Sequence, residues 1–363
     1  MVKTVGVCGY GSTGSSAVVD LLHEFDETQV LDIELVFVRK KHGLVDLEYL
    51  LKNHGSFKAI TRFIYLFTKY KFFGLAGREK INKAALDRAL NGFIDEIVSN
   101  IQGQSYIDYI KSNRVKILRY IERILNKHFP ISIFRNVELN NYRNFTIMPD
   151  KFEEAARTFI DEVLTGFGMD LNNKEKSIVT LNQSFNTRDP VKCFKFFKNP
   201  MAIIVDRDPR DQYLFSKYYL NPRGVRLIPS DNVDTYIKWF CKKRQFPSGI
   251  REREDIIFIN FESLVYDTEN ATKKVADFLK INKHIRKGEC FKPSHSRNNT
   301  QLFKKYTECE SDIRRIESEL SDFIFPFEDY PDIEPEGGMF YGSQNNKITK
   351  PVKEYIHDIK KIK

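Results

Sequence analysis

A glycine-rich turn close to the start of the chain restricts the fold more than any other stretch of the sequence. Apolar residues predict a buried strand over residues 5–7, and the turn that follows contains Gly9, Gly11 and Gly14. A helix should come next, since apolar residues recur at helical spacing over residues 17–22. Glycine permits positive φ angles and a close approach of the backbone, so successive N–H groups can point at an anion on the positive N-terminus of the helix. The strand, turn and helix therefore predict a site for phosphate or sulfate.

Two nucleotide-binding motifs overlap in this turn. Residues 9–14, Gly-Tyr-Gly-Ser-Thr-Gly, satisfy the GxGxxG pattern of dinucleotide-binding folds. Followed by Ser15 and Ser16, the same stretch has the spacing of a Walker loop in which Ser15 takes the place of the lysine. That lysine normally contacts the β and γ phosphates, so its absence argues against a nucleoside triphosphatase. A glycine turn that binds no ligand is the structural alternative.

Composition and cysteine spacing bound the class of protein. The chain has 363 residues, enough for one large α/β domain or two smaller ones. Its five cysteines are scattered without metal-type spacing, so we predict neither a disulfide framework nor a metal site, and a reducing environment fits. The sequence shows no basic and then apolar leader and no apolar run of about 18 residues. We therefore expect a cytoplasmic protein without a transmembrane segment.

The positive charge of the chain is concentrated in one segment. Residues 57–135 contain 15 Lys and Arg residues against 6 Asp and Glu residues, an excess of 9 that equals the net charge of the whole chain. The simplest explanation is a solvated helical surface, and the two functional ones are an anionic acceptor substrate or an anionic membrane surface. If an acceptor binds there, Lys69, Lys71 and Lys80 should contribute to its binding. We expect no nucleic-acid partner, and peripheral membrane contact stays open.

Strand and helix patterns alternate along the rest of the chain. Further strands are predicted at 31–38, 177–181, 201–205 and 256–261, and helices at 152–164, 268–279 and 313–323. This alternation predicts an α/β fold with a parallel sheet flanked by helices. Residues 1–335 should form one domain, with a basic helical insertion at about 44–148, and residues 336–363 should form an irregular tail.

A second candidate site follows a predicted central strand. Residues 206–211 read Asp-Arg-Asp-Pro-Arg-Asp and lie where that strand ends, the edge at which open α/β sheets bind ligands. Pro209 suits the first position of a helix that Asp208 would cap. Arg207 and Arg210 would then stand at this edge as forked donors for a phosphate. The structural alternative pairs the arginines with the neighbouring aspartates.

Four stretches, taken in order, resemble the sulfotransferases that use 3′-phosphoadenosine 5′-phosphosulfate (PAPS). Residues 12–22 resemble the family's 5′-phosphosulfate loop, and residues 205–216 resemble its 3′-phosphate motif, an arginine, a proline two residues later and then a serine. Residues 257–279 resemble the strand and helix that come next in the family. Residues 294–305, which begin Ser-His-Ser-Arg-Asn-Asn, resemble its C-terminal cofactor-covering loop. The order of the four stretches is more specific than any one of them.

The resemblance implies a P-loop-like nucleotide-binding sulfotransferase fold and an enzyme that transfers a sulfuryl group in line from PAPS to a hydroxyl or amine. In such an enzyme, backbone N–H groups and serine hydroxyls of the turn stabilise the charge that builds on the 5′-phosphate. The acceptor would be a carbohydrate or a lipid-linked sugar, as in polysaccharide biosynthesis. Carried over position by position, the resemblance assigns PAPS binding to Gly11, Ser12, Thr13, Gly14, Ser15, Ser16, Arg207, Ser216, Ser296, Arg297, Asn298 and Asn299.

The chain departs from the family pattern at two positions. Ser12 stands where the family usually has a catalytic lysine or arginine, which steadies the bridging oxygen as sulfate leaves. Ser216 lies nine residues after Arg207, whereas the family serine lies eight residues after its arginine, the place that Phe215 takes here. One residue turns a helical side chain by about 100°. Ser216 can therefore reach a 3′-phosphate only if the helix is locally wider.

The base that accepts the proton of the acceptor has two candidates. Family members that sulfate glycans resemble this chain at residues 34–37, where a glutamate three residues before a phenylalanine serves as the base. This implies Glu34, and partial burial would raise its pKa toward a useful value. His42 follows the same predicted strand and is the second candidate. Glu34 could instead be a solvated or salt-bridged structural residue.

Two other functions remain open from the sequence. A nicotinamide-dependent oxidoreductase, using NAD(P), would bind its cofactor at the GxGxxG turn and its ribose at Asp32 or Glu34, about 20 residues further on. Against it, an apolar run at 35–38 follows Glu34, so the acid does not close the predicted strand, and residues 206–211 have no role. The other alternative is a non-catalytic relative that binds a nucleotide or a glycan.

Overall fold

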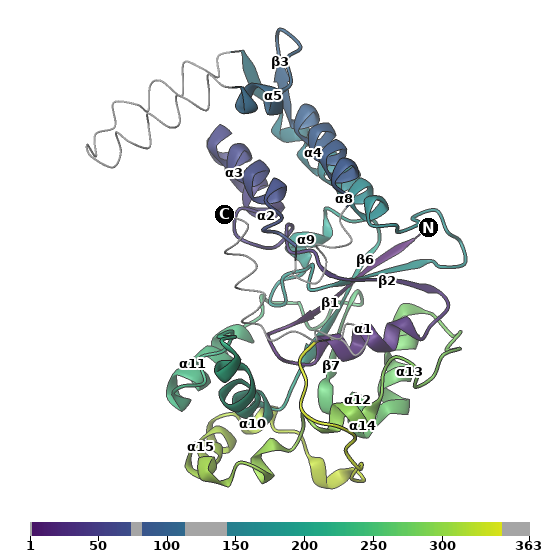
Figure 1. Cartoon of the computed structure of the whole chain (residues 1–363), viewed down its shortest axis with the longest axis vertical. Coiled ribbons are helices and arrows are strands. Elements are labelled where there is room, and N and C mark those ends of the chain that lie inside the picture. Colours follow the sequence, from purple (N-terminus) through teal and green to yellow (C-terminus); the bar gives the residue numbers. More distant parts are fainter. Residues whose placement is uncertain (1, 74–81, 113–143, 343–363) are drawn as a thin grey trace, which may run out of the picture.

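A five-stranded parallel sheet forms the centre of the molecule (Figure 1). The computed structural model describes residues 2–73, 82–112 and 144–342. The strands lie in the order β2-β5-β1-β6-β7, and every neighbouring pair is parallel. Their bounds are β1 Lys3–Gly9, β2 Thr28–Glu34, β5 Ile178–Asn182, β6 Pro200–Asp206 and β7 Ile256–Asn260. The predicted α/β fold with a parallel sheet flanked by helices is confirmed.

The three central strands are apolar because helices cover both faces of the sheet. Every residue of β5 is buried, and partial exposure in β1 and β6 is confined to residues at the strand ends. Val5 of β1 pairs with Thr180 on one side and with Met201 on the other. Continuous burial of this kind is typical of parallel strands between two helical layers. Each fully buried valine or isoleucine contributes roughly 1.5–3 kcal/mol through its removal from water.

Helices from different parts of the chain cover the two faces. One face packs against α1 (Ser15–His23), α12 (Phe261–Tyr266) and α13 (Thr268–Leu279). Figure 1 shows a second group of helices on the opposite side of the sheet. Their apolar residues form one core with the sheet residues on that side. These helices are α2 (Leu44–His54), α3 (Phe57–Thr68), α4 (Lys83–Ile97) and α8 (Phe152–Gly166).

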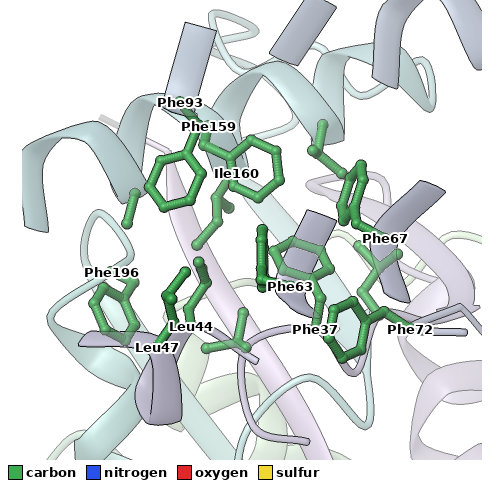
Figure 2. Close-up of a cluster of buried hydrophobic side chains, with 14 of the residues drawn as sticks. Phe37, Leu44, Leu47, Phe63, Phe67, Phe72, Phe93, Phe159, Ile160 and Phe196 are labelled. Atoms are coloured by element: carbon green, nitrogen blue, oxygen red, sulfur yellow. The ribbon is translucent and has the colours of Figure 1, made fainter. Parts of the chain in front are cut away.

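Phenylalanine rings dominate the core between this second group of helices and the sheet (Figure 2). Phe93 of α4 stacks on Phe159 of α8 with ring centroids 4.8 Å apart. Phe37 and Phe63 each meet the edge or face of Phe159, at centroid distances of 5.6 and 6.1 Å. Aromatic pairs of this kind contribute about 0.5–1.5 kcal/mol beyond the area they bury. The described phenylalanines of the basic segment are therefore buried or partly buried in a packed core, whereas Tyr65 of the same segment is exposed.

The remaining elements are short or lie beside the sheet. α10 (Pro209–Leu214), α11 (Val233–Lys243) and α15 (Glu310–Glu319) share a third apolar core. A small antiparallel pair, β3 with β4, was not expected from the sequence. The bounds of the other elements are β3 Val98–Asn100, α5 Tyr106–Lys111, β4 Phe145–Ile147, α9 Val191–Phe194 and α14 Pro293–Arg297.

The range expected to be a helical insertion, residues 44–148, contains α2 to α5 and the β3–β4 pair. Lys80 and residues 113–143 of this range lie outside the described residues. α4 packs along α8, which follows the range, so helices from inside and outside it share one core. The domain division remains a prediction. In the described part of the chain, no helix is both long and apolar enough to cross a bilayer.

The strand expected at 31–38 is displaced and shorter. β2 runs from Thr28 to Glu34, and the chain then leaves the sheet. Leu35 forms a bridge with Phe73, and the N–H of Val36 donates to the carbonyl oxygen of Phe72 over 3.0 Å. Residues 35–38 are buried in the aromatic core rather than in a strand. A short apolar run has the same pattern in both settings, which is why the sequence did not separate them.

The strand order also bears on the oxidoreductase alternative. The sequence argument against it, that Glu34 does not close its strand, is wrong because β2 ends at Glu34. The topology provides a different objection. In the dinucleotide-binding fold the first two strands are neighbours, with the order 3-2-1-4-5-6. Here β5 lies between β1 and β2, so the carboxylate at the end of β2 is two strands away from the glycine turn.

Candidate active site

A cavity of about 930 Å³ opens where the parallel strands end. Its lining includes residues that follow β1, β5, β2 and β6, together with residues from the C-terminal part of the chain. The register places these strand ends side by side, since Asn182 pairs with both Val7 and Glu34. Open α/β sheets bind ligands at this edge, and pockets of about 300–1,000 Å³ hold small molecules and cofactors. The cavity is the candidate active site.

The glycine turn forms one wall of the cavity and adopts the backbone geometry of an anion site. Gly11, Ser12 and Gly14 have φ angles of 93°, 53° and 82°, all in the left-handed region. α1 then begins at Ser15. Backbone N–H groups in such a turn converge on one point at the positive end of the helix. A Cβ atom on Gly14 would lie 2.2 Å from the ring of Phe261, so this position also needs glycine for space.

Polar side chains from neighbouring segments hold the turn in place. Gln183 donates from Nε2 to the Ser15 hydroxyl over 2.8 Å and accepts from the Gly9 N–H over 3.4 Å. Thr187 donates to the Gly9 carbonyl oxygen over 2.9 Å, and Gln212 donates to that of Gly11 over 2.7 Å. Within the turn itself, the hydroxyl of Thr13 accepts from the N–H of Tyr10 over 3.2 Å, so the Thr13 side chain shapes the turn.

The loop after β5 is a part of the site that sequence analysis missed. Residues Asn182, Gln183, Asn186, Thr187 and Arg188 all line the cavity. The sequence indicated only a connecting loop between a strand and Pro190. One signal was present: the loop is rich in amides and hydroxyls and follows a strand directly, at the edge where the other candidate residues were expected.

Arg207 is buried and joins three of the predicted pieces of the site. Its Nη1 donates to the carbonyl oxygen of Ser12 over 2.9 Å, and its Nη2 donates to that of Asn299. The guanidinium lies between the rings of Phe215 and Phe261, 4.9 and 5.4 Å from their centroids. Burial lowers the pKa of Arg207, and among the described residues no carboxylate lies within ion-pair distance of it. The charges of Asp211, Glu262 and Asp208 oppose the effect of burial on this pKa, but none of these carboxylates bonds to the guanidinium directly.

Arg210 has a different environment, and its expected role as a second phosphate donor is wrong. Its Nη2 pairs with Asp208 and its Nη1 with Glu317, both over 2.8 Å. Burial alone would lower the pKa of Arg210, but the bonds and charge of Asp208 raise it above its usual range. The expected cap is confirmed, because Asp208 accepts from the Arg210 N–H over 2.9 Å and Pro209 is the first helical residue. Arg210 is therefore a structural residue.

A buried carboxylate fixes the C-terminal loop against α10. Asp211 accepts from the N–H groups of Gln301 and Leu302 over 2.7 and 2.6 Å. Burial, reinforced by the charge of Asp208, raises the pKa of Asp211 to about 7. Glu262 is also fully buried and accepts from the Asp208 N–H over 3.1 Å. These contacts hold the loop that contains the candidate residues 296–299 beside Arg207.

Only two of the four candidates in this loop face the cavity. Ser296 and Asn299 line it. Arg297 points away and pairs with Asp332 over 2.9 Å. Asn298 also points away, donating to the carbonyl oxygen of Glu336 over 2.6 Å. The PAPS contacts that the resemblance implied for Arg297 and Asn298 therefore have no support from their positions.

The described start of the tail, residues 336–342, contains no helix or strand and runs along this loop. The N–H of Glu336 donates to the carbonyl oxygen of Ser294 over 3.0 Å. Asn299 donates to the carbonyl oxygen of Phe340 over 3.0 Å and accepts from its N–H over 3.3 Å. Phe340 and Tyr341 line the cavity as a result. The tail was expected to be irregular, and its contribution to the cavity was not expected.

Ser216 lies in a locally widened helix but does not line the cavity. Phe215 to Leu220 form a π-helical turn, the widening that the shifted spacing required. The Ser216 hydroxyl is fully buried and accepts from the Ser230 hydroxyl over 2.9 Å. Phe215, at the position of the family serine, lines the cavity instead. The structure thus places the Ser216 hydroxyl in a structural bond, away from the candidate phosphate site.

Of the two candidate bases, Glu34 lies in the cavity and His42 does not. Glu34 is exposed to the cavity, yet the surrounding protein withdraws water and raises its pKa, with a further increase from Asp32 and an opposing effect from Arg39. Two strand spacings of about 4.8 Å separate the end of β2 from β1. His42 has a left-handed φ of 66°, and its N–H donates to Asp46 over 2.8 Å in the turn before α2.

Several buried polar atoms at the cavity have no partner among the described residues. A buried polar atom without a hydrogen bond costs about 1–3 kcal/mol, so such atoms are rare unless a water or a ligand binds them. Here they belong to cavity-lining residues from four separate segments. They are Tyr10 Oη, Ser12 Oγ, Asn182 Oδ1, Arg207 Nε and Ser296 Oγ. Residues with unused polar groups therefore gather around the cavity, as is common next to a site for a polar ligand.

Comparisons with known proteins give little similarity. No protein-family model matches the chain, and no curated protein matches it significantly. Among solved structures, retinol dehydratase in complex with androsterone and inactive cofactor PAP is similar over 92% of this chain and 82% of that one, with 13% identity and a TM-score of 0.30. Retinol dehydratase in a complex with retinol and PAP is similar over 92% and 83%, with 14% identity and a TM-score of 0.29. These TM-scores are too low to support an inference about the fold or the site, so both are inferred from the residues of this chain.

Proposed function

We propose that the protein is a sulfotransferase that moves a sulfuryl group from PAPS to a hydroxyl or amine of a carbohydrate or lipid-linked sugar. One observation carries the proposal. The glycine turn, Arg207 and the loop at 296–299 are far apart in the sequence, yet a chain of hydrogen bonds joins them around one cavity. These are the stretches that resemble the two phosphate motifs and the covering loop of the family.

The residues present fit a donor with phosphate groups at both ends. Backbone N–H groups of residues 11–16 and the Ser15 and Ser16 hydroxyls would hold the 5′-phosphosulfate at the positive end of α1. Arg207 and Ser296 both line the cavity and would meet the 3′-phosphate. A phosphate would add a directly bonded negative charge to the more distant charges of Asp211, Glu262 and Asp208.

The reaction needs a base and a preorganised leaving-group site, and no covalent intermediate. The acceptor oxygen or nitrogen attacks the sulfur in line, the bond from sulfur to the 5′-phosphate oxygen breaks, and Glu34 takes the proton of the acceptor. A raised pKa makes Glu34 a better proton acceptor near neutral pH. Ser12 contributes only a hydroxyl where the family has a cation, so its donated hydrogen bond would be weaker than the family's charged contact.

The oxidoreductase alternative is weakened by the strand order, which separates Glu34 from the glycine turn by β5. It also leaves the unpartnered Arg207 Nε and Ser296 Oγ without a ligand group. The proposal keeps the cytoplasmic location and the role in polysaccharide biosynthesis that the sequence suggested. A non-catalytic relative would bind the same nucleotide and differ only in turnover.

Two measurements test the proposal. Adenosine 3′,5′-bisphosphate should raise the melting temperature of the protein, and NADPH should not, because only the former matches both phosphate sites. Transfer of radiolabelled sulfate from PAPS should then be screened across glycan, phenol and lipid acceptors. Stabilisation by NADPH alone would refute the proposal. Stabilisation by the bisphosphate without any transfer would identify a non-catalytic nucleotide-binding protein.

A further inference from the structure

We infer that one end of the cavity binds a negative charge on the acceptor, so that the substrate is an anionic sugar, carrying a phosphate or carboxylate near the hydroxyl that is sulfated. This inference rests on the proposed function and specifies its acceptor. The residues concerned are Arg39, Lys40 and Lys71, here called the β2 anion site, and all three line the cavity.

The fold brings these cations together from two distant segments. Arg39 and Lys40 follow β2, and Lys71 follows α3. The Lys40 ammonium donates to the carbonyl oxygen of Lys71 over 3.1 Å. Two further contacts pin the same segments, the Leu35–Phe73 bridge and the 3.0 Å bond from Val36 to Phe72. The β2 anion site is thus built into the turn by which the chain leaves the sheet.

The charge of the β2 anion site is only partly compensated within the protein. Among the described residues, none of its three cations forms an ion pair, although Arg39 donates from Nε to the carbonyl oxygen of Gln183. Glu34 is close enough that Arg39 and Lys40 both lower its pKa against the effect of burial. Two carboxylates of the lining, Asp32 and Glu34, also lie at this end, so the three cations leave an excess of one positive charge. An added anion would therefore find attraction here rather than repulsion.

The position of the β2 anion site assigns it to the acceptor and not to the donor. Arg207, at the end of β6, and the glycine turn after β1 hold the donor in the proposed function. The β2 anion site lies on the other side of β1, beyond β5, next to the candidate base. An anion bound there would sit beside Glu34, and the sugar that carries it would extend past the end of β5 toward the glycine turn.

The surroundings favour a sugar over a bare ion. Val36 and Phe73 line the same end and offer an apolar surface on which a ring can pack. Tyr341 is partly exposed, and removal of water by the surrounding protein, followed by the charge of Glu34, raises the pKa of its phenol to about 12. That phenol stays protonated at neutral pH and can donate a hydrogen bond to a sugar oxygen.

Binding to the complex with adenosine 3′,5′-bisphosphate tests the inference, because the saturating nucleotide fills the donor phosphate sites. Titration calorimetry would compare a hexose 1-phosphate, a hexuronate and the neutral methyl hexoside. We expect at least one of the two anionic sugars to bind roughly tenfold more tightly than the neutral one, which is the gain in affinity that one or two charge contacts give. This preference should fall as the salt concentration rises. If only the hexose 1-phosphate or only the hexuronate binds more tightly than the neutral sugar, that result identifies which anionic group the site binds.

The matched variants are Lys40→Gln/Lys71→Gln and Lys69→Gln. The expectation that Lys69 contributes to acceptor binding is not supported, because Lys69 lies two residues from Lys71, is exposed and does not line the cavity. The double variant should lose the preference for the anionic sugars while keeping its affinity for the nucleotide, which shows that it folds. Lys69→Gln should keep both.

The outcomes separate this inference from the proposed function. If the nucleotide binds but the three sugars bind alike, or if the double variant retains the preference, the β2 anion site is refuted and the proposed function stands. If Lys69→Gln loses the preference as fully as the double variant, the preference comes from the general positive charge of the surface, and the inference is refuted. If the nucleotide itself does not bind, the proposed function fails, and the inference falls with it.

Discussion

The Nη1 atom of Arg207 lies 2.9 Å from the carbonyl oxygen of Ser12, so a side chain from the end of β6 supports the turn at the end of β1. The two residues are 195 positions apart in the sequence. The contact links the candidate sites for the two ends of one nucleotide, because Ser12 belongs to the 5′ turn and Arg207 to the 3′ motif. A bound donor would therefore be held by one connected structure.

Arg207→Ala should abolish tight binding of adenosine 3′,5′-bisphosphate and should also lower the free energy of unfolding, because Arg207 donates to the carbonyl oxygens of Ser12 and Asn299. Its burial lowers its pKa, so the charge costs free energy in the absence of ligand. Removing one partner of a buried charged pair costs about 2–5 kcal/mol of binding, or roughly 30-fold and more in Kd.

Arg210→Ala is the matched control. It leaves the buried Asp208 without its partner, so it should lower the free energy of unfolding by about 3–5 kcal/mol, measured by urea denaturation. Provided that the variant remains folded, its nucleotide affinity should change far less than that of Arg207→Ala. Equal losses of affinity in the two variants would show that Arg207 acts through the fold alone.

Gly14→Ala should damage both folding and nucleotide binding. The new Cβ would lie 2.2 Å from Phe261, whose ring packs on Arg207, and φ at this position is 82°. We expect about 1–3 kcal/mol from overpacking in addition to about 1–2 kcal/mol from the left-handed backbone.

Gly55→Ala separates the two causes. Gly55 ends α2 with a φ of 54°, and a methyl group added there would have no neighbouring atom within 4 Å, so only the backbone strain applies. Thermal unfolding and nucleotide titration of both variants would measure the difference. A Gly14→Ala protein no less stable than Gly55→Ala would contradict the tight packing of the turn.

Much of the fold could be predicted from the sequence because its signals are local. The glycine turn, the apolar runs at 201–205 and 256–261, and the Asp208 cap each depend on a few neighbouring residues. Residues 35–38 could not be placed in this way, since an apolar run is equally compatible with a sheet and with an aromatic core. The order of the strands in the sheet could not be predicted either, because it depends on contacts between segments that are distant in the sequence.

The site was predicted where a motif marks it and missed where contacts build it. Arg207 and the turn were found by pattern, but their neighbour Arg210 has the same side chain and is held by Asp208 and Glu317 instead. Asn182 and Gln183 belong to no motif and enter the site only because β5 inserts between β1 and β2. Spacing along the chain does not contain that information.

Ser216→Ala and Ser296→Ala should have opposite consequences. The Ser216 hydroxyl is bonded to Ser230, so its loss should lower the free energy of unfolding by about 0.5–1.5 kcal/mol and leave nucleotide affinity unchanged. The Ser296 hydroxyl is buried at the cavity without a partner, so its loss should cost little stability and weaken nucleotide binding by up to about tenfold. A stronger effect of Ser216→Ala on affinity would restore the family assignment of this serine.

The pH dependence of turnover should report on Glu34. A base must be deprotonated to accept the proton, and the pKa of Glu34 is raised, so turnover should fall as pH drops through that raised value. Glu34→Gln should remove this acidic limb, reduce turnover by roughly 10² or more and keep nucleotide affinity.

Arg39→Gln offers a sharper test of the same assignment, because it should move the limb without removing it. Arg39 lowers the pKa of Glu34, so its loss should shift the acidic limb to higher pH. His42→Ala should leave the profile in place, since His42 does not line the cavity. If turnover survives in Glu34→Gln and collapses in His42→Ala, the base is His42. If the acidic limb of the pH profile stays at the same pH in Arg39→Gln, a group other than Glu34 titrates.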